Sequence, residues 1–311
     1  MTQANSSLLV VGSVAVDWVI TPTAERKESV GGSATFFSMA ASYFGSVRLV
    51  GIVGTDFPKQ AVEDLRSRGV DMAGLEVVPD GLTFRWKGRY HANMNDRDTL
   101  ETQLNVFETF DPKLPDAYRS SDLLFLANIQ PDLQLRVLDQ VERPRLVGLD
   151  TMNLWIGTAR AKLLEVLKRV DVLMINEEEA RQLTEEPNLV KAAAMIAELG
   201  PKSVVIKRGE YGAMLFHDGQ IFAAPALPLA NVIDPTGAGD SFAGGFMGYL
   251  GRVGEMTGEH LRSAMIYGSV LASYCVEGFS YDNIAALDHA KIDARYDAFS
   301  RLTQFERATL G

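Results

Sequence analysis

Short apolar runs alternate with longer amphipathic stretches along most of the chain. This order is expected when crossover helices cover a largely parallel sheet. The predicted strands lie at residues 8–20, 47–54, 123–127, 146–150, 172–176 and 204–207. The predicted helices between them lie at residues 58–68, 132–142 and 158–169. The pattern therefore predicts an α/β fold with a mostly parallel central sheet.

Composition and charge narrow the class of protein. The 311 residues are 47% hydrophobic and 23% charged, which is ordinary for a globular protein. A formal net charge of −10 argues against broad binding to nucleic acid or to an anionic membrane. The single Cys275 has no intramolecular partner for a disulfide, so we expect a helix core residue in a reducing, cytoplasmic setting. The four histidines show no metal-ligand spacing.

The most informative segment is a glycine-rich loop that leads into an apolar helix, at residues 233–246. Backbone N–H groups of small residues at a helix start, here Gly237, Ala238 and Gly239, converge on an anion. Asp240 follows them directly and is a candidate general base for phosphoryl transfer to an alcohol. The alternative is a tight loop in which this carboxylate only caps the helix.

Two other glycine motifs do not fit this chain. A dinucleotide fingerprint needs Gly or Ala three residues after its second glycine, but Phe242 stands there. The string of a P-loop nucleotide site occurs nowhere in the sequence. A nucleotide must therefore be held in another way.

The string from Asp234 to Asp240 resembles the signature of the ribokinase-like, or PfkB, family of carbohydrate and nucleoside kinases. Four further segments resemble motifs of that family in the same order. They are residues 10–17, the pair Gly31-Gly32, residues 176–179 and residues 207–212. The resemblance implies one three-layer α/β/α domain over residues 1–311 with a mostly parallel central sheet. It also implies a small β-sheet lid from about residues 15–30 and 82–108.

The resemblance also implies roles for individual residues. Those expected to bind the acceptor substrate are Asp17, Gly31, Gly32 and Phe36. Those expected to bind the nucleotide are Asn176, Lys207, Gly209 and Gly212. Mg²⁺ is expected near Glu179 and Asn176, held through water. A monovalent cation, with potassium as the hypothesis, is expected near Asp234 and Thr236.

Several of these residues have simpler interpretations. Asp17 would be costly to bury unless hydroxyl groups donate to it, and the alternative is an exposed acid at a strand end. Only the alignment with Asn176 singles out Glu179, because three successive glutamates also suit the first turn of a helix. Lys207 either neutralises phosphate or extends its ammonium into solvent from the end of a strand.

Phe36 departs from the family pattern, because it stands where related sugar and nucleoside kinases often carry an asparagine. An aromatic ring there can stack on a base, a sugar face or a cyclitol ring, or it can pack in the core. The departure makes ribokinase and adenosine kinase proper less favoured.

Residues 82–91 interrupt the alternation of strands and helices. Phe84, Trp86 and Tyr90 share one face of this segment, and basic residues share the other. One interpretation is the family's lid, which closes over the substrate and excludes water. The other is an edge strand whose solvated basic side chains prevent aggregation. Arg97, in the turn that follows, is a candidate phosphate ligand, although a surface charge needs no such role.

The sequence thus predicts a cytoplasmic kinase that uses ATP and Mg²⁺ to phosphorylate a hydroxyl of a small sugar-like molecule. The alternatives are a nucleoside kinase and, outside enzymes, a sugar- or nucleotide-sensing protein on a kinase scaffold. A homodimer formed through the lid is a further expectation from the resemblance. No nucleic-acid or membrane partner is expected.

Overall fold

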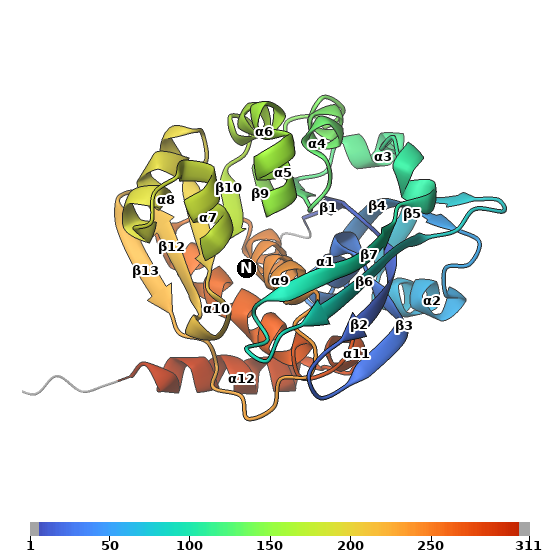
Figure 1. Ribbon diagram of the computed structural model, residues 1–311. Coiled ribbons are helices and arrows are strands. Elements are labelled where there is room, and N and C mark those ends of the chain that lie inside the picture. The colour runs from blue at the N-terminus through green and yellow to red at the C-terminus, as the bar shows by residue number, and fades with distance from the viewer. Residues whose placement is uncertain (1–5, 305–311) are drawn as a thin grey trace, which may run out of the picture.

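A nine-stranded sheet forms the middle layer of the protein, for which a computed structural model describes residues 6–304. Its strands are β1 (Leu8–Val11), β4 (Val47–Gly54), β5 (Val70–Val78), β8 (Leu123–Leu126), β9 (Leu146–Asp150), β10 (Val172–Asn176), β11 (Ser203–Lys207), β12 (Ala213–His217) and β13 (Gln220–Ala224). Their order is β13-β12-β11-β10-β9-β8-β1-β4-β5 (Figure 1). Neighbours from β5 to β11 pair in parallel, and β12 and β13 add an antiparallel edge. The predicted mostly parallel sheet is confirmed.

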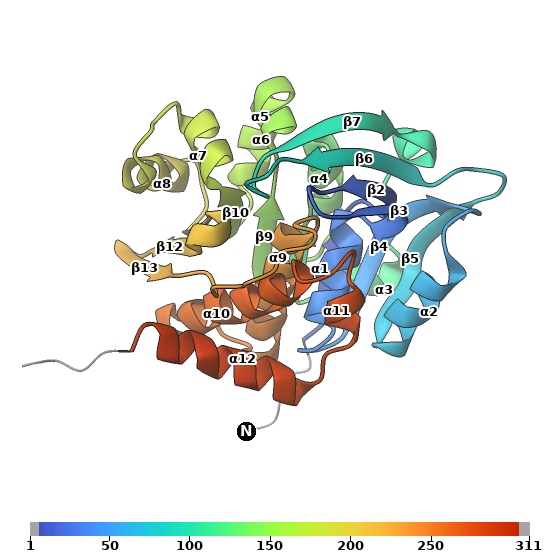
Figure 2. The ribbon, with the colours of Figure 1, turned by 60° about the horizontal axis from the view of Figure 1, so that its bottom comes forward.

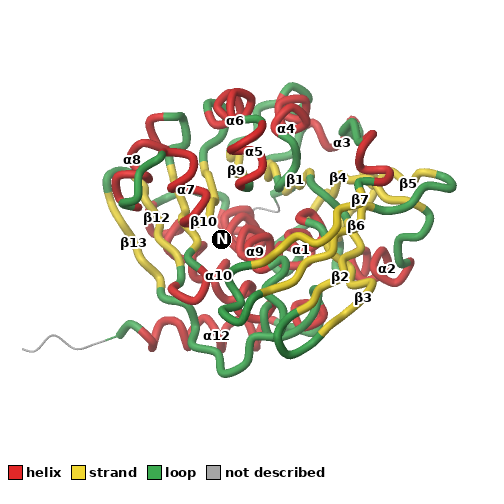
Figure 3. The backbone as a smooth tube through the Cα atoms, in the orientation of Figure 1, coloured by secondary structure: helices red, strands yellow, loops and turns green. Residues whose placement is uncertain are grey.

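Helices cover both faces of this sheet (Figures 2 and 3). One face packs against α1 (Ser33–Ala41), α2 (Lys59–Ser67), α9 (Ala238–Val253), α10 (Gly258–Cys275), α11 (Asp282–Ala285) and α12 (His289–Leu302). The other face packs against the 3-10 helix η1 (Asn105–Thr109) and against α3 (Asp116–Arg119), α4 (Pro131–Leu138), α5 (Asn153–Thr158), α6 (Arg160–Leu167), α7 (Glu177–Thr184) and α8 (Leu189–Glu198).

The buried strands explain the two hydrophobic cores. In β1, Leu8 and Val10 pack in one core, whereas Leu9 and Val11 pack in the other. Successive side chains of a strand point to opposite faces, so a continuous apolar run marks a strand covered on both sides. Cys275, at the end of α10, is buried in the first of these cores, as predicted.

A second, four-stranded sheet forms the lid. Its strands are β2 (Ala15–Ile20), β3 (Glu25–Gly31), β6 (Phe84–Tyr90) and β7 (Arg97–Gln103), in the order β3-β2-β6-β7. The outer pairs are antiparallel and the central pair, β2 with β6, is parallel. Figure 1 shows α9 between this lid and the unit formed by β10 and α7. The predicted small lid is therefore present.

The prediction of one strand over residues 8–20 is wrong. The chain leaves the central sheet after Val11 and enters the lid at Ala15. Between these strands, the Ser13 hydroxyl accepts a hydrogen bond from the Ser33 backbone N–H at 3.0 Å, which ties the connection to the start of α1. An apolar run does not reveal such a break, because both strands are buried. As a result, Asp17 lies on the lid and not on the central sheet.

The other predicted elements are present with small shifts at their ends. The helix predicted at 132–142, for example, ends at Leu138. Within residues 6–304, no helix combines the length and the apolar character needed to cross a membrane.

Candidate active site

The glycine-rich loop enters α9 through a left-handed turn. Gly237 is the N-cap residue of the helix, with φ 77° and ψ 0°. A Cβ atom at this position would lie 2.3 Å from the ring of Phe36, so glycine is required both by the backbone and by the close approach. Residues 235–240 are all partly exposed. The N-terminus of α9 is therefore accessible, and a helix N-terminus favours an anion.

Asp240 lies in the first turn of α9, and its environment sets its acidity. The pKa of this carboxyl is raised to about 7, chiefly by burial and then by the negative charge of Asp150, whereas the charges of Lys207 and Arg97 lower it. A carboxyl with such a pKa exchanges its proton near neutral pH. This is the range in which a general base works best.

A buried ion pair lies beside the loop. The Lys207 ammonium at the end of β11 donates a hydrogen bond to Asp150 Oδ2, at the end of β9, over 3.0 Å. The same nitrogen lies 3.1 Å from the point where a Cβ of Gly239 would stand. Lys207 thus points into the site and not into solvent. Asp150 was not among the predicted site residues, although an acid that ends an apolar strand is a signal for such a role.

Asn176 and Glu179 form a capping box at the start of α7. Glu179 N donates to Asn176 Oδ1 at 2.8 Å, and Asn176 N donates to Glu179 Oε2 at 2.9 Å. The simpler interpretation of these residues, as a helix start, is thus present in the structure. Glu179 is nevertheless buried, and burial followed by the charge of Asp150 raises its pKa to about 7. Its second oxygen takes no part in the capping box, whereas the Glu177 carboxylate pairs with Arg181.

Asp17 brings a further carboxyl to the site from the lid. It is buried, and a Cβ added to Gly31 would lie only 1.9 Å from Asp17 Oδ2, so glycine leaves room for this carboxyl. Burial raises the pKa of Asp17 to about 8, with Asp234 and Asp240 contributing through their charges. The alternative of an exposed acid at a strand end is wrong. Gly32 follows as the N-cap of α1.

The lid reaches across the site to both of its sides. The Tyr90 hydroxyl accepts a hydrogen bond from Thr236 Oγ1 at 3.1 Å, which joins β6 to the glycine-rich loop. At the lid tip, Asn95 Oδ1 lies 2.4 Å from the place of a Cβ at Gly209. Arg97, at the start of β7, lowers the pKa of Asp240. It is therefore close enough to act on the site.

Gly209 and Gly212 form the tight turn that follows β11. Both have positive φ, 53° and 87°, and Arg208 N donates to Gly212 O at 2.8 Å. A 3-10 turn, η2 (Gly209–Tyr211), lies between them. The structure thus brings the predicted nucleotide turn next to Lys207.

Asp234 and Phe36 both contact the glycine-rich loop. Asp234 Oδ1 accepts a hydrogen bond from Thr236 N at 2.8 Å. Its other oxygen is buried and makes no hydrogen bond of standard geometry within residues 6–304, although the Ser280 backbone N–H is near enough to the carboxyl to lower its pKa. Phe36 is 2% exposed with its ring against Gly237, so its position corresponds to the core-packing alternative. Its contact with an acceptor stays a prediction.

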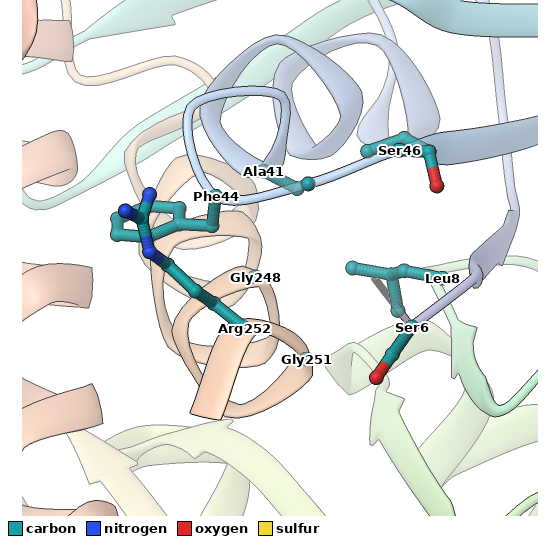
Figure 4. A pocket seen from close by; sticks show the side chains of 10 residues that line it. Ser6, Leu8, Ala41, Phe44, Ser46, Gly248, Gly251 and Arg252 are labelled. Atoms are coloured by element: carbon teal, nitrogen blue, oxygen red, sulfur yellow. The ribbon is translucent and has the colours of Figure 1, made fainter. Parts of the chain in front are cut away.

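A small pocket lies far from these residues (Figure 4). Leu8, Phe44, Gly251 and Arg252 line it, among others. Arg252 is near the C-terminal end of α9, and the helix rises about 18 Å between residues 240 and 252. The pocket therefore contributes nothing to the site around Asp240.

Comparison with known proteins identifies the family of this chain. Residues 5–285 match the pfkB family carbohydrate kinase domain, so the chain belongs to the PfkB family of kinases, which transfer phosphoryl to a hydroxyl. A cytidine kinase from Thermococcus kodakarensis is 34% identical over 77% of this chain and 87% of its own length. A 2-dehydro-3-deoxygluconokinase from Thermoproteus tenax is 30% identical over 83% of this chain and 82% of its own.

A solved structure gives the same architecture. The nucleoside kinase of Burkholderia thailandensis in complex with inosine superposes with a TM-score of 0.75 over 94% of this chain and 97% of that one. At 20% identity, this likeness shows the ribokinase-like fold alone.

Proposed function

We propose that the protein is an ATP-dependent kinase in which Asp240 deprotonates the acceptor hydroxyl. The observation that carries this proposal is the position of Asp240 at the N-terminus of α9, with the Lys207 ammonium beside Gly239. A proton acceptor next to an anion-binding helix start is what in-line phosphoryl transfer to an alcohol requires.

The proposed mechanism assigns each residue a separate task. Asp17 forms a hydrogen bond with a hydroxyl of the acceptor and so orients the acceptor toward Asp240. Backbone N–H groups at Gly237, Ala238 and Gly239 stabilise charge that develops on the transferred phosphoryl. The lid excludes water from the acceptor, which limits hydrolysis of ATP.

The phosphate side of the site fits Mg²⁺ bound with ATP. Glu179 is a buried carboxyl whose pKa is raised to about 7 by burial and by the charge of Asp150. One of its two oxygens is not used by the capping box. When bound, Mg²⁺ screens the phosphate oxygens. No group of three or more His, Cys, Asp or Glu within residues 6–304 forms a metal cage. Asn176 and Glu179 would therefore hold the ion through its water shell.

The glycine-rich loop also fits a monovalent cation. The buried oxygen of Asp234 that makes no hydrogen bond of standard geometry would be a ligand for it, with Thr236 beside it. A cation there would order the loop and strengthen its dipoles.

The charges around Asp17 favour an uncharged acceptor. Asp234 and Asp240 both act on this carboxyl, and Arg85, which lines the same pocket as Asp17, pairs with Asp56. The other two cations of the pocket, Lys27 and Lys87, place their ammonium groups over the Trp18 ring. A carboxylate on the acceptor would meet repulsion that a neutral sugar, cyclitol or nucleoside does not. A nucleoside is the second candidate, because the cytidine kinase relative covers most of the chain.

Replacing Asp240 with asparagine removes the proton acceptor and keeps the side-chain shape. We expect Asp240→Asn to lower kcat by about 10²- to 10⁴-fold, while calorimetry gives an ATP affinity within a few-fold of the wild-type value. Asp116→Asn, at an exposed acid in the first turn of α3, is the matched control and should keep full turnover. Near-normal turnover in Asp240→Asn would reject the mechanism.

The pH dependence of kcat/KM tests the acidity of Asp240. The base must be ionised to accept a proton, and its pKa is about 7, so activity should fall as the pH drops below 7 and level off above it. The expected slope is about tenfold per pH unit. Glu179 has a similar pKa, so the same limb should be measured in Glu179→Gln, where it should persist. A flat profile from acid to alkaline pH contradicts the assignment.

Turnover in potassium compared with tetramethylammonium tests the cation site. We expect several-fold higher activity in potassium, because only the small ion can reach the buried oxygen of Asp234. Asp234→Asn should remove the difference. Equal rates in the two salts with the wild-type protein would eliminate the cation from the account.

A panel of acceptors scored for ATP consumption tests the substrate class. It should contain neutral sugars, cyclitols, cytidine and other nucleosides, and 2-dehydro-3-deoxygluconate. We expect an uncharged acceptor to exceed the sugar acid in kcat/KM by about 100-fold or more, since juxtaposed like charges cost several kcal/mol. The sugar acid as best acceptor would show that the lid supplies a cation that we have not assigned.

A further inference from the structure

The Asp150–Lys207 ion pair joins the ends of two strands that are not neighbours in the sheet. Asp150 ends β9, Lys207 ends β11, and β10 lies between them. The Lys207 side chain must therefore cross the end of β10 to reach its partner. Asp150 is buried, with 7% of its side chain exposed, and Lys207 is mostly buried, with 17% exposed. Asp150 is fixed from its other oxygen as well, which accepts a hydrogen bond from Thr151 N at 2.9 Å.

The charges around this pair do not balance. Asp150, Glu179 and Asp240 bring three carboxyls to the place where a phosphate would lie, against the cations Lys207 and Arg97. Arg97 belongs to the lid, so Lys207 is the cation that the central sheet itself supplies. The Lys207 ammonium already donates to Asp150, so a phosphate oxygen would have to compete with this carboxylate for it.

We propose that Asp150 makes the phosphate site select metal-complexed nucleotide over metal-free nucleotide. This inference rests on the proposed function. When Lys207 turns from Asp150 to a phosphate, it leaves a carboxylate that is buried without its partner. Such a charge is costly. A nucleotide that brings a divalent cation compensates that carboxylate, and a nucleotide without one adds to the repulsion. Asp150 is thus a specificity-determining residue that acts through Lys207.

Calorimetric titration with ADP tests this without any acceptor. The dissociation constant is measured once in excess Mg²⁺ and once in EDTA, and their ratio gives the preference for the metal complex. In Asp150→Asn, we expect the preference to fall by about tenfold or more, because one charge near the phosphates has been removed. Most of the change should come from tighter binding of metal-free ADP.

The chain offers a control at the opposite ends of β10 and β11. Lys202, just before β11, and Asp171, just before β10, also form an ion pair at 3.0 Å, but the lysine side chain there is 70% exposed. Asp171→Asn should leave the preference for the metal complex unchanged. An equal fall in this variant would mean that the effect is a general loss of negative charge, which overturns the proposal.

A second variant covers the case in which Asp150→Asn does not fold. Lys207→Met leaves Asp150 without its partner from the start, so metal-free ADP should be excluded even more strongly and the preference should rise. If either variant folds and its preference for metal-complexed ADP is unchanged, the inference is overturned. The kinase proposal still stands in that case, provided that the wild-type protein binds ADP. A wild-type protein that binds no ADP under either condition refutes the kinase proposal, and the inference with it.

Discussion

An excess of carboxylates in one site is the constraint on which its chemistry depends. Asp17, Asp150, Glu179 and Asp240 come from four different elements, and burial raises the pKa of three of them, Asp17, Glu179 and Asp240, toward or above neutrality. Lys207 offsets only part of this charge. The site therefore has more negative than positive charge, and a cation that is bound with the nucleotide would offset the difference. The same excess keeps Asp240 basic enough to accept a proton.

The lid and the glycine-rich loop share the task of closing this site. The hydrogen bond between Tyr90 and Thr236 joins the lid to the loop, and Asn95 reaches the nucleotide turn at Gly209. A lid that contacts both sides is in a position to respond to the acceptor and to the nucleotide together. Water would therefore be excluded only when the acceptor and the nucleotide are both bound, because the lid would close fully only in contact with both ligands.

Local patterns in the sequence predicted the parts of the structure that local chemistry decides. The strand and helix pattern predicted the layered fold, and the glycines at 237 and 239 predicted the tight turn into α9, whose anion-binding role stays a prediction. The apolar pattern missed the break between β1 and β2, since two buried strands in succession look like one, whereas the lid bounds implied by the family resemblance begin at residue 15. Asp150 was missed for a different reason. Its partner Lys207 is 57 residues away, and no spacing rule links the ends of two strands separated by a third.

The expectations of one domain, of a lid-mediated dimer and of a cytoplasmic setting stay predictions. The central claim is that phosphoryl passes between the first amides of α9 and Asp240. A crystal structure with ADP, Mg²⁺, an accepted substrate and aluminium fluoride tests it most directly. The account predicts a planar fluoride group against residues 237–239, with an Asp240 oxygen about 3 Å from the attacking hydroxyl. A fluoride group bound elsewhere, or a hydroxyl that meets another base, would contradict it.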